Sequence, residues 1–117
     1  MAQVSRGRRS KSKRQATVFA ALGDETRLVL LTRVCEGKQV SITQLASGLP
    51  VTRQGITKHL RVLESAGIVR GIPSGRETLF ELHPRPLVEA SDFLDAVCRE
   101  WDEALKKLKA FVERTSE

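Results

Sequence analysis

The segment at residues 51–70, VTRQGITKHLRVLESAGIVR, combines a helical pattern with many hydrogen-bond donors. Ile56, Leu60, Leu63 and Ala66 recur every three or four positions, which predicts a helix with one buried stripe. The polar and cationic side chains of this helix and its cap are Thr52, Arg53, Gln54, Thr57, Lys58, His59 and Arg61. In the major groove of DNA, arginine and lysine donate to guanine, glutamine pairs with adenine, and threonine contacts a phosphate or a thymine methyl group. We therefore interpret this face as a DNA-reading surface rather than as a solvated face alone.

Catalytic and metal-binding chemistry has less support in the sequence. His59 has no histidine, cysteine or suitably placed carboxylate among its sequence neighbours, so we interpret it as a base or phosphate contact. His83, which precedes Pro84, is interpreted as a structural loop histidine. Cys35 and Cys98 are too few for a disulfide framework and are expected to be small core residues. The sequence thus predicts a protein that is not an enzyme and that has no cofactor and no metal site.

The net charge of +6 is unevenly distributed along the chain. The first 14 residues, MAQVSRGRRSKSKR, carry six cations and no acid, so the remaining chain is neutral overall. Within that remainder, residues 51–76 carry five cations against one acid, whereas residues 81–104 carry two cations against seven acids. A basic middle next to an acidic segment is expected where only the middle contacts a polyanion such as double-stranded DNA.

The length of 117 residues fits one folded domain that needs no disulfides. Residues 1–14 are rich in serine, glycine and cations, so we expect a disordered basic tail there and a folded domain over residues 15–117. No apolar run follows the N-terminal charges as in a signal peptide, and none approaches the roughly 18 to 20 residues of a membrane span. We therefore expect a cytoplasmic protein without membrane contact.

Helix-start and helix-stop residues divide the first half of the domain into four predicted helices. The first ends at Gly23, and Asp24 caps a second that ends at Gly37, where a left-handed turn is expected. The residues S-I-T-Q at 41–44 form a capping box that opens a very short third helix, and Thr52 caps the fourth. The apolar face of the second helix is expected to consist of Leu28, Leu31 and Val34. The third and fourth helices together predict a helix-turn-helix.

Beyond Gly67 the apolar pattern changes from helical to alternating, which predicts a β-hairpin with its turn at residues 73–75. Arg70 and Arg76 are expected near the tip of the hairpin, as phosphate or minor-groove contacts. Residues 86 to about 113 then form one long helix of about 40 Å. Its apolar stripe is longer than a domain of this size can cover, so part of it is expected to face a second subunit.

Four stretches of the chain resemble the arsenic-repressor (ArsR) family of winged helix-turn-helix transcription regulators. ALGDETRLVLL at residues 21–31 is similar to the opening two helices, and GITKHLRVLESAGIV at 55–69 is similar to the recognition helix and the entry to the wing. SGRETLFEL at 74–82 is similar to the wing itself. EWDEALKKLKAFVE at 100–113 resembles a branch of the family that lacks the metal ligands.

The resemblance implies a mostly helical fold with a small β-hairpin wing and a homodimer formed through the first and last helices. The dimer contacts it suggests are Phe19, Leu94, Cys98, Trp101 and Leu105. Two recognition helices would enter successive major grooves about 34 Å apart, which matches an inverted repeat. The implied function is a repressor that occupies the promoter.

Two departures from the family pattern concern the signal to which such a repressor responds. Metal-sensing relatives carry a Cys-Val-Cys pattern on the third helix, where this chain has Ser41, Ile42 and Thr43, and hydroxyls do not replace thiolates for soft metal ions. A second pattern places Asp and His ligands along the last helix, where this chain has Asp92 but no histidine. The sequence identifies no small-molecule inducer.

Two other functions stay open on the sequence alone. In one, the winged fold binds another protein and the basic tail tethers it to acidic surfaces. In the other, the DNA-binding function is kept and a disulfide between Cys35 and Cys98 acts as a thiol switch, although Cys35 lies about one helical turn from the matching position of the sulfur-responsive branch.

Overall fold

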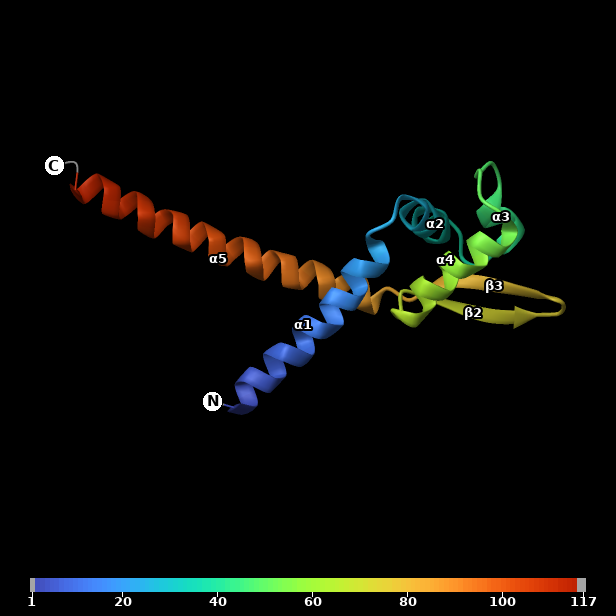
Figure 1. The fold of residues 1–117 in the computed structure, drawn as a ribbon, viewed down its shortest axis with the longest axis horizontal. Coiled ribbons are helices and arrows are strands. Elements are labelled where there is room, and N and C mark those ends of the chain that lie inside the picture. The colour runs from blue at the N-terminus through green and yellow to red at the C-terminus, as the bar shows by residue number, and fades with distance from the viewer. Residues whose placement is uncertain (1, 116–117) are drawn as a thin grey trace.

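The computed structural model describes residues 2–115 of the chain and the side chains of residues 12–115. Its elements are α1 (Ala2–Leu22), α2 (Glu25–Glu36), β1 (Val40–Ser41), α3 (Ile42–Ala46), α4 (Arg53–Ser65), β2 (Val69–Ser74), β3 (Glu77–Leu82) and α5 (Arg85–Thr115) (Figure 1). This order of helices and strands confirms the predicted mostly helical winged helix-turn-helix class.

The predicted helix starts are present as hydrogen bonds to side chains. The backbone N–H of Arg27 donates to Asp24 Oδ2 at 3.1 Å and so caps α2. The N–H of Gln44 donates to Ser41 Oγ at 3.2 Å, and the N–H of Ser41 donates back to Gln44 Oε1 at 3.0 Å. Thr52 Oγ1 accepts a bond of 3.0 Å from the first turn of α4. Each bond satisfies an amide that has no partner inside its helix, so these caps determine where α2, α3 and α4 begin.

Gly37 ends α2 in a different way from the one predicted. Its φ of −107° is extended, so the expected left-handed turn is absent at this residue. A Cβ added at Gly37 would lie 2.7 Å from Val40 Cγ2. Glycine is required here because the chain passes close to β1, and not because φ is positive.

The wing is a three-stranded antiparallel sheet in the order β1-β3-β2. The sequence does not predict β1, because two residues are too few to show an alternating pattern. The turn lies at Gly75 and Arg76 rather than at residues 73–75, since residues 73 and 74 still pair with β3. Gly75 has a φ of 62° and Arg76 does not have a positive φ, which is the pattern of a type II′ turn. This turn type matches the natural twist of the two strands.

The hydrophobic core lies where α1, α2, α3 and α4 meet the sheet. Its fully buried side chains are Leu30, Val34, Leu45, Ile56, Leu60, Leu63 and Ile68. The stripe predicted for α4 is therefore confirmed. The stripe predicted for α2 is partly wrong, because Leu28 is 48% exposed and Leu30 takes the buried position. The inward side of α2 also carries Arg27, which is half-buried.

The long helix α5 extends well beyond the rest of the domain (Figure 1). Its first part packs against α1, where the rings of Phe19 and Phe93 lie 6.2 Å apart. Every side chain from Cys98 to Thr115 is exposed. The radius of gyration is 19.9 Å, whereas a compact chain of this length has about 13 Å. The second half of α5 thus has no cover within the described part of the chain.

Helix α1 begins at Ala2, so its bounds include most of the tail that the sequence predicts to be disordered. The side chains of residues 1–11 lie outside the described part of the structure. The first buried side chain that is described is Gln15, and a folded domain over residues 15–117 stays a prediction. A disordered tail over residues 1–14 stays a prediction.

Candidate nucleic-acid interface

Helix α4 is fixed on the domain by its inward face. Ile56, Leu60 and Leu63 are fully buried in the core. On the flank that faces the wing, Glu64 Oε2 accepts a hydrogen bond of 3.0 Å from the backbone N–H of Gly71 in β2. Packing and this bond together hold the recognition helix in one orientation relative to the sheet.

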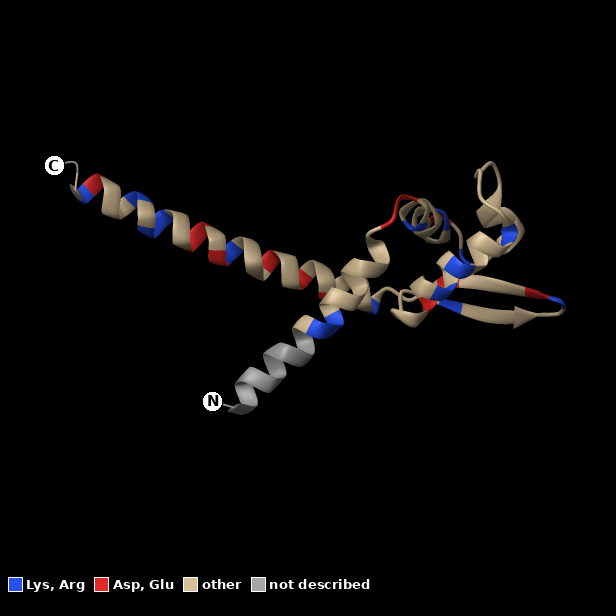
Figure 2. Ribbon diagram, in the orientation of Figure 1, with Lys and Arg blue, Asp and Glu red and all other residues tan. Residues whose placement is uncertain are grey.

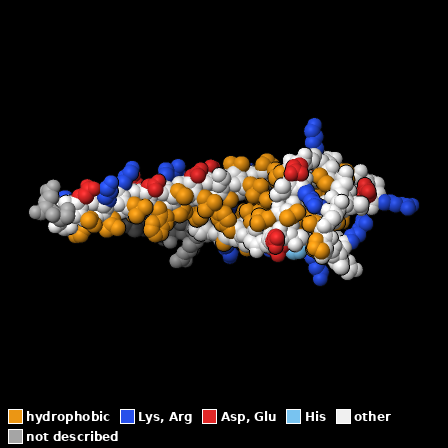
Figure 3. Space-filling view, turned by 90° about the horizontal axis from the view of Figure 1, so that it is seen from above, with side chains coloured by type: hydrophobic (Ala, Val, Ile, Leu, Met, Phe, Trp, Pro, Cys, Tyr) orange, Lys and Arg blue, Asp and Glu red, His pale blue; other side chains and the backbone are white. Residues whose placement is uncertain are grey.

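The outward face of α4 presents side chains that the domain itself does not use. Gln54, Lys58 and Arg61 lie within about 60° of one another around the helix axis, opposite the buried stripe. Arg53, the first residue of α4, lies about 100° around the axis from Gln54. All four side chains are exposed, and none makes a hydrogen bond or ion pair with the described residues. Cationic positions follow α4 in Figure 2, and Figure 3 shows cationic side chains projecting from this end of the molecule. The arrangement leaves their donors available to an external ligand.

The two threonines of the predicted surface already make hydrogen bonds within the helix. Thr52 Oγ1 accepts the capping bond, and Thr57 Oγ1 donates to the carbonyl of Arg53 at 3.0 Å. Thr52 is exposed and Thr57 is half-buried. The hydroxyl proton of Thr57 is therefore used internally, while its methyl group and oxygen lone pairs stay available for contact.

His59 does not lie freely on the outward face. Its Nδ1 is 3.2 Å from Arg27 Nη1 and 3.7 Å from Asp24 Oδ2. Asp24, at the start of α2, is thus a carboxylate next to His59 in the fold, which the sequence neighbours of His59 do not reveal. A guanidinium can only donate, so the contact with Arg27 uses Nδ1 as the acceptor, whereas an ion pair with Asp24 requires a protonated ring. The Arg27 backbone N–H lowers the pKa of Asp24, and charge from His59 and Arg27 lowers it further.

Arg27 connects three helices through this contact, although the sequence analysis did not identify it. Its Nε donates to the carbonyl of Ala21 at 2.6 Å and its Nη2 to that of Ala20 at 3.4 Å, both at the end of α1. A third bond reaches His59 on α4. Arg27 thus links the last turn of α1 to the middle of the recognition helix. An arginine at an inward-facing position of an amphipathic helix is the signal that could have revealed this role.

The two arginines predicted for the wing have different surroundings. Arg76 occupies the turn at the tip and is exposed, as predicted (Figure 2). Arg70 lies at the base of β2, so its predicted place near the tip is wrong. Its Nε donates to Glu81 Oε1 across the sheet at 3.1 Å, and this guanidinium holds the pKa of Glu81 below its usual value. The ion pair neutralises the charge of Arg70, whereas that of Arg76 stays free.

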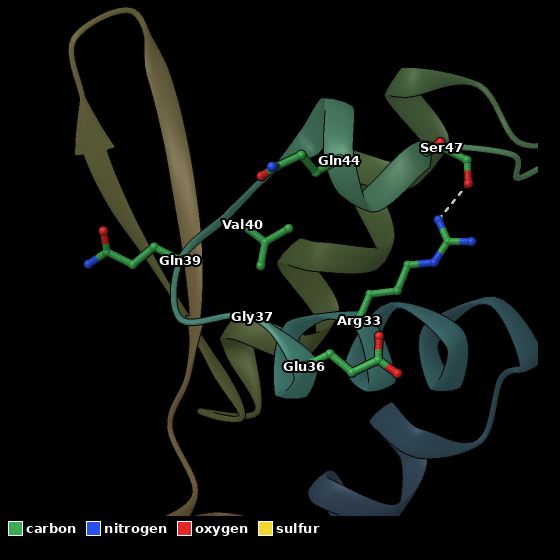
Figure 4. Close-up of a pocket in the computed structure, with 7 residues that line it drawn as sticks. All are labelled: Arg33, Glu36, Gly37, Gln39, Val40, Gln44 and Ser47. Carbon is green, nitrogen blue, oxygen red and sulfur yellow. Dashed lines mark hydrogen bonds between the residues drawn. The ribbon is translucent and has the colours of Figure 1, made fainter.

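A second arginine anchors the first helix of the helix-turn-helix. Arg33 Nη1 donates to the carbonyls of Leu45 at 2.7 Å and Ser47 at 2.6 Å, at the end of α3. Figure 4 shows this side chain at one side of a shallow, open depression of about 480 Å³ between α2 and α3. Gln44, on the far side, is held in the capping box of α3. The depression is thus bordered by groups that position the helix-turn-helix.

Comparison with known proteins agrees with this geometry. A family described as "Helix-turn-helix domain" matches residues 22–72. HTH-type transcriptional regulator Rv2034 of Mycobacterium tuberculosis is 35% identical over 87 residues, which are 74% of this chain and 78% of that protein. An ArsR-like transcriptional regulator from Rhodococcus sp. RHA1 is 36% identical, with a TM-score of 0.77 over 87% of this chain and 95% of that one. The chain belongs to the ArsR family of winged helix-turn-helix transcriptional regulators.

This ArsR-family chain is also similar to two proteins whose names state a role or an assembly. The HTH-type transcriptional repressor SmtB of Mycobacterium tuberculosis is 32% identical over 88 residues, 75% of this chain and 63% of that protein. A homodimeric winged helix-turn-helix DNA-binding domain from Mycobacterium bovis is 19% identical, with a TM-score of 0.62 over 85% of this chain and 88% of that one. At this identity the second similarity shows the fold alone.

The metal ligands of the metal-sensing ArsR relatives are not matched in this chain. Ser41, Ile42 and Thr43 take their places at the end of β1 and the start of α3, and Ser41 Oγ is engaged in the capping box. Within the described residues, no three or more histidine, cysteine, aspartate or glutamate side chains are grouped to hold a metal ion. The donor set therefore does not fit a soft metal ion.

The predicted dimer residues of this ArsR-family chain fall into two groups. Leu94, Trp101 and Leu105 are 49%, 65% and 57% exposed, and Cys98 is exposed between them. Figure 3 shows hydrophobic side chains in a line along α5. Phe19 instead is half-buried against Phe93 of its own chain.

Both cysteines are free and exposed, so their predicted core role is wrong. Cys35 lies on the outward side of α2, and Cys98 lies on the part of α5 that α1 does not cover.

Among the helices that the structure describes, none is long and apolar enough to cross a membrane.

Proposed function

We propose that this ArsR-family regulator is a homodimeric repressor that binds an inverted-repeat operator in double-stranded DNA. The observation that carries the proposal is the outward face of α4, where exposed donors without partners in the described chain lie on a capped helix whose other face is buried. In a helix-turn-helix, the first turns of such a helix reach base edges in the major groove. Occupying the promoter then blocks transcription, in keeping with the name repressor given to a relative.

The individual side chains take different roles in this proposal. Arg53, Gln54, Thr57 and Lys58 reach base edges from the first half of α4, while Thr52, Arg61 and Arg76 contact phosphates. His59 and Arg70 act mainly as positioning residues, because Arg27 and Glu81 already engage their polar atoms. The basic residues 1–14 add affinity without sequence preference, since cations without a fixed geometry displace counterions but do not select bases.

Helix α5 provides the proposed dimer interface. Leu94, Cys98, Trp101, Leu105, Leu108 and Val112 follow one another at alternating steps of four and three residues, which is the a/d pattern of helices that pair along a seam. Residues 85–103 of α5 carry two cations against six acids, and residues 104–115 carry four cations against one acid. An antiparallel pair of these helices therefore places opposite charges side by side. A domain from Mycobacterium bovis with the same fold is named homodimeric.

The experiment that tests the proposal first selects duplexes from a random pool and then compares two matched variants. Lys58→Ala removes an exposed cation from α4, and Lys107→Ala removes an exposed cation from α5. We expect the selection to enrich an inverted repeat. Lys58→Ala should weaken operator binding by about 1 to 3 kcal/mol with unchanged thermal stability, and Lys107→Ala should bind like wild type.

Two outcomes would contradict the recognition-helix assignment. One is a Lys58→Ala variant that binds the selected operator as tightly as wild type. The other is equal retention of the operator and of scrambled DNA at physiological salt, which would favour the protein-interaction alternative with a basic tether.

The exposure of Cys35 and Cys98 is the observation that favours a thiol-switched regulator as a second candidate. Operator titrations under reduced, oxidised, zinc-loaded and chelated conditions separate the candidates. We propose that affinity is the same with zinc and with chelator, because the residues do not fit such a metal. A loss of affinity on oxidation that disappears in Cys35→Ser would establish the thiol switch.

The remaining assignments follow from operator binding. The regulator acts in the cytoplasm, where the promoter DNA is, and its partners are double-stranded DNA and a second copy of the chain. It acts by binding and not as an enzyme, without a cofactor.

A further inference from the structure

Arg27 on α2 joins the end of α1 to the recognition helix. The carbonyls of Ala20 and Ala21, which accept from its Nη2 and Nε, are among the last four of α1, and these lack a partner inside the helix. The Nη1 atom of the same guanidinium lies 3.2 Å from His59 Nδ1 on α4. A guanidinium is planar and carries its donors in a fixed fork, so the bonds to α1 determine where the remaining donor meets α4. Arg27 thus relates the position of α4 to that of α1.

This contact and the wing contact hold α4 on two different flanks. His59 lies about 140° around the helix axis from Glu64, whose carboxylate accepts from the backbone N–H of Gly71. The outward face of α4 lies between these flanks on the side away from the core. One side-chain contact on each flank therefore fixes how far α4 is rotated about its own axis, and so where the outward donors point.

The contact with Arg27 requires an uncharged His59. Protonation of the ring places a proton on Nδ1 and a positive charge next to the guanidinium, so the hydrogen bond is lost. Asp24 Oδ2 lies 3.7 Å from the same Nδ1 and is a partner for the protonated ring. Asp24 is available as a carboxylate because the Arg27 backbone N–H lowers its pKa. His59 thus has two partners at the start of α2 that require opposite charge states.

Other charged groups around His59 do not take part in this choice. Helices α1, α2 and α3 and strand β2 pack against α4, but α3 and the last two turns of α1 carry no ionisable side chain. On α2, Glu25 is exposed, and on β2, Arg70 is paired with Glu81. The other charged residues of α4 lie at least about 100° around the axis from His59. Among the described residues, Asp24 and Arg27 are the ones that make polar contacts with the ring.

We propose that Arg27 positions the recognition helix relative to α1, and that protonation of His59 releases this link and weakens operator binding. The effect on binding rests on the proposed function, whereas the contact itself does not. The sign of the effect separates this role from the one predicted from the sequence. A histidine that contacts phosphate binds DNA more tightly when it is protonated, because the cation is attracted to the polyanion. A histidine that holds the helix through Arg27 binds DNA less tightly.

Operator titrations at about pH 8 and about pH 5.5, at constant ionic strength, test the proposal because histidine changes its charge between these values. His83 is the other histidine of the chain and is exposed, so His83→Gln is a matched control for His59→Gln. The measured quantity is the ratio of operator affinity at the lower pH to that at the higher pH. We expect the ratio to be at least about fivefold lower in wild type and His83→Gln than in His59→Gln.

The reason is that the glutamine oxygen can accept from Arg27 at either pH. A wild-type ratio equal to or above that of His59→Gln would overturn the proposal. A His83→Gln ratio equal to that of His59→Gln would overturn it as well, because the effect would then not be specific to the ring that contacts Arg27.

Two variants at the start of α2 test the partners of His59. Arg27→Met removes the link, so it should bind the operator more weakly than wild type at about pH 8 and have the ratio of His59→Gln. Asp24→Asn keeps an oxygen that can cap α2 but removes the charge that attracts the protonated ring, so its ratio should lie between those of wild type and His59→Gln. A lower affinity of Arg27→Met with an unchanged wild-type ratio is what a merely structural role would give, and it would overturn the proposal.

Nitrogen-15 NMR of the DNA-free protein observes the contact without an operator. At about pH 8 we expect the His59 ring to carry its proton on Nε2 and to accept at Nδ1, and a proton on Nδ1 would overturn the link. Sedimentation should give the same dimer content at both pH values. A dimer that dissociates at the lower pH in wild type but not in His59→Gln would overturn the helix-positioning role. A protein that has the expected ring state but prefers no operator at either pH would reject the proposed function and support the contact.

Discussion

Leu105→Asp tests the dimer seam without disturbing the folded domain. Leu105 is 57% exposed and belongs to the part of α5 that no described element of the same chain covers. Val88 on the same helix is 55% exposed but lies about 120° around the axis from the seam. Val88→Asp is therefore a matched control that introduces the same charge at nearly the same exposure.

The size of the effect follows from the exposed area. Full burial of a leucine side chain stabilises by about 1.5 to 3 kcal/mol, so burying the 57% that is exposed here contributes about 0.9 to 1.7 kcal/mol. A two-fold interface contains the residue twice, which makes the loss about 1.7 to 3.4 kcal/mol per dimer. The dissociation constant should thus rise by roughly 20- to 300-fold, and burial of the new carboxylates adds to this.

Sedimentation measured over nanomolar to micromolar concentrations gives the dissociation constants directly. Far-ultraviolet circular dichroism should show the same helix content in Leu105→Asp, Val88→Asp and wild type. Operator binding should fall with dimer content in Leu105→Asp alone. Equal dissociation constants for Leu105→Asp and wild type, or equal weakening by both variants, would refute the seam.

Three further predictions concern the folded domain and the tail. Gly37→Ala should destabilise by about 1 to 3 kcal/mol in urea unfolding because its Cβ meets the stiff Val40 side chain, whereas Gly23→Ala, with its nearest atom at 3.4 Å, should be near neutral. Because folding lowers the pKa of Asp24 below 3.8, its charge stabilises the fold above that pH. The stability difference between wild type and Asp24→Asn should therefore shrink as the pH falls through the lower folded value, and a difference that does not change with pH would contradict this. Removal of residues 1–14 should reduce the log–log salt slope of operator binding by at most about 5 per subunit and leave the operator preference intact.

The features predicted correctly from the sequence are those that depend on neighbours within a few residues. The capping box of Ser41 and Gln44 and the caps at Asp24 and Thr52 each join residues three apart. The stripe of α4 is likewise periodic over one helix. Local hydrogen bonding and periodicity thus suffice to predict a helix-turn-helix and its outward face.

The incorrect predictions involve partners that are distant in the chain. Arg27 lies 32 residues from His59, so no local pattern indicates that the histidine is already engaged. The pairing of Arg70 with Glu81 depends on the hairpin register, which is set by a turn at Gly75 and Arg76 rather than at the predicted residues 73–75. The charges available to DNA can be assigned only once these pairings are known.

The apolar stripes of α4 and α5 show why periodicity alone does not determine burial. Both repeat every three or four residues, yet Leu60 is fully buried and Leu105 is 57% exposed. The difference arises because α2, α3 and the sheet surround α4, whereas α1 covers only the first part of α5. Cys98 was expected in the core for the same reason, since its place in an apolar pattern does not show whether the cover comes from its own chain. The exposed stripe is therefore consistent with the proposed dimer, in which a second copy of α5 supplies a partner with the same period.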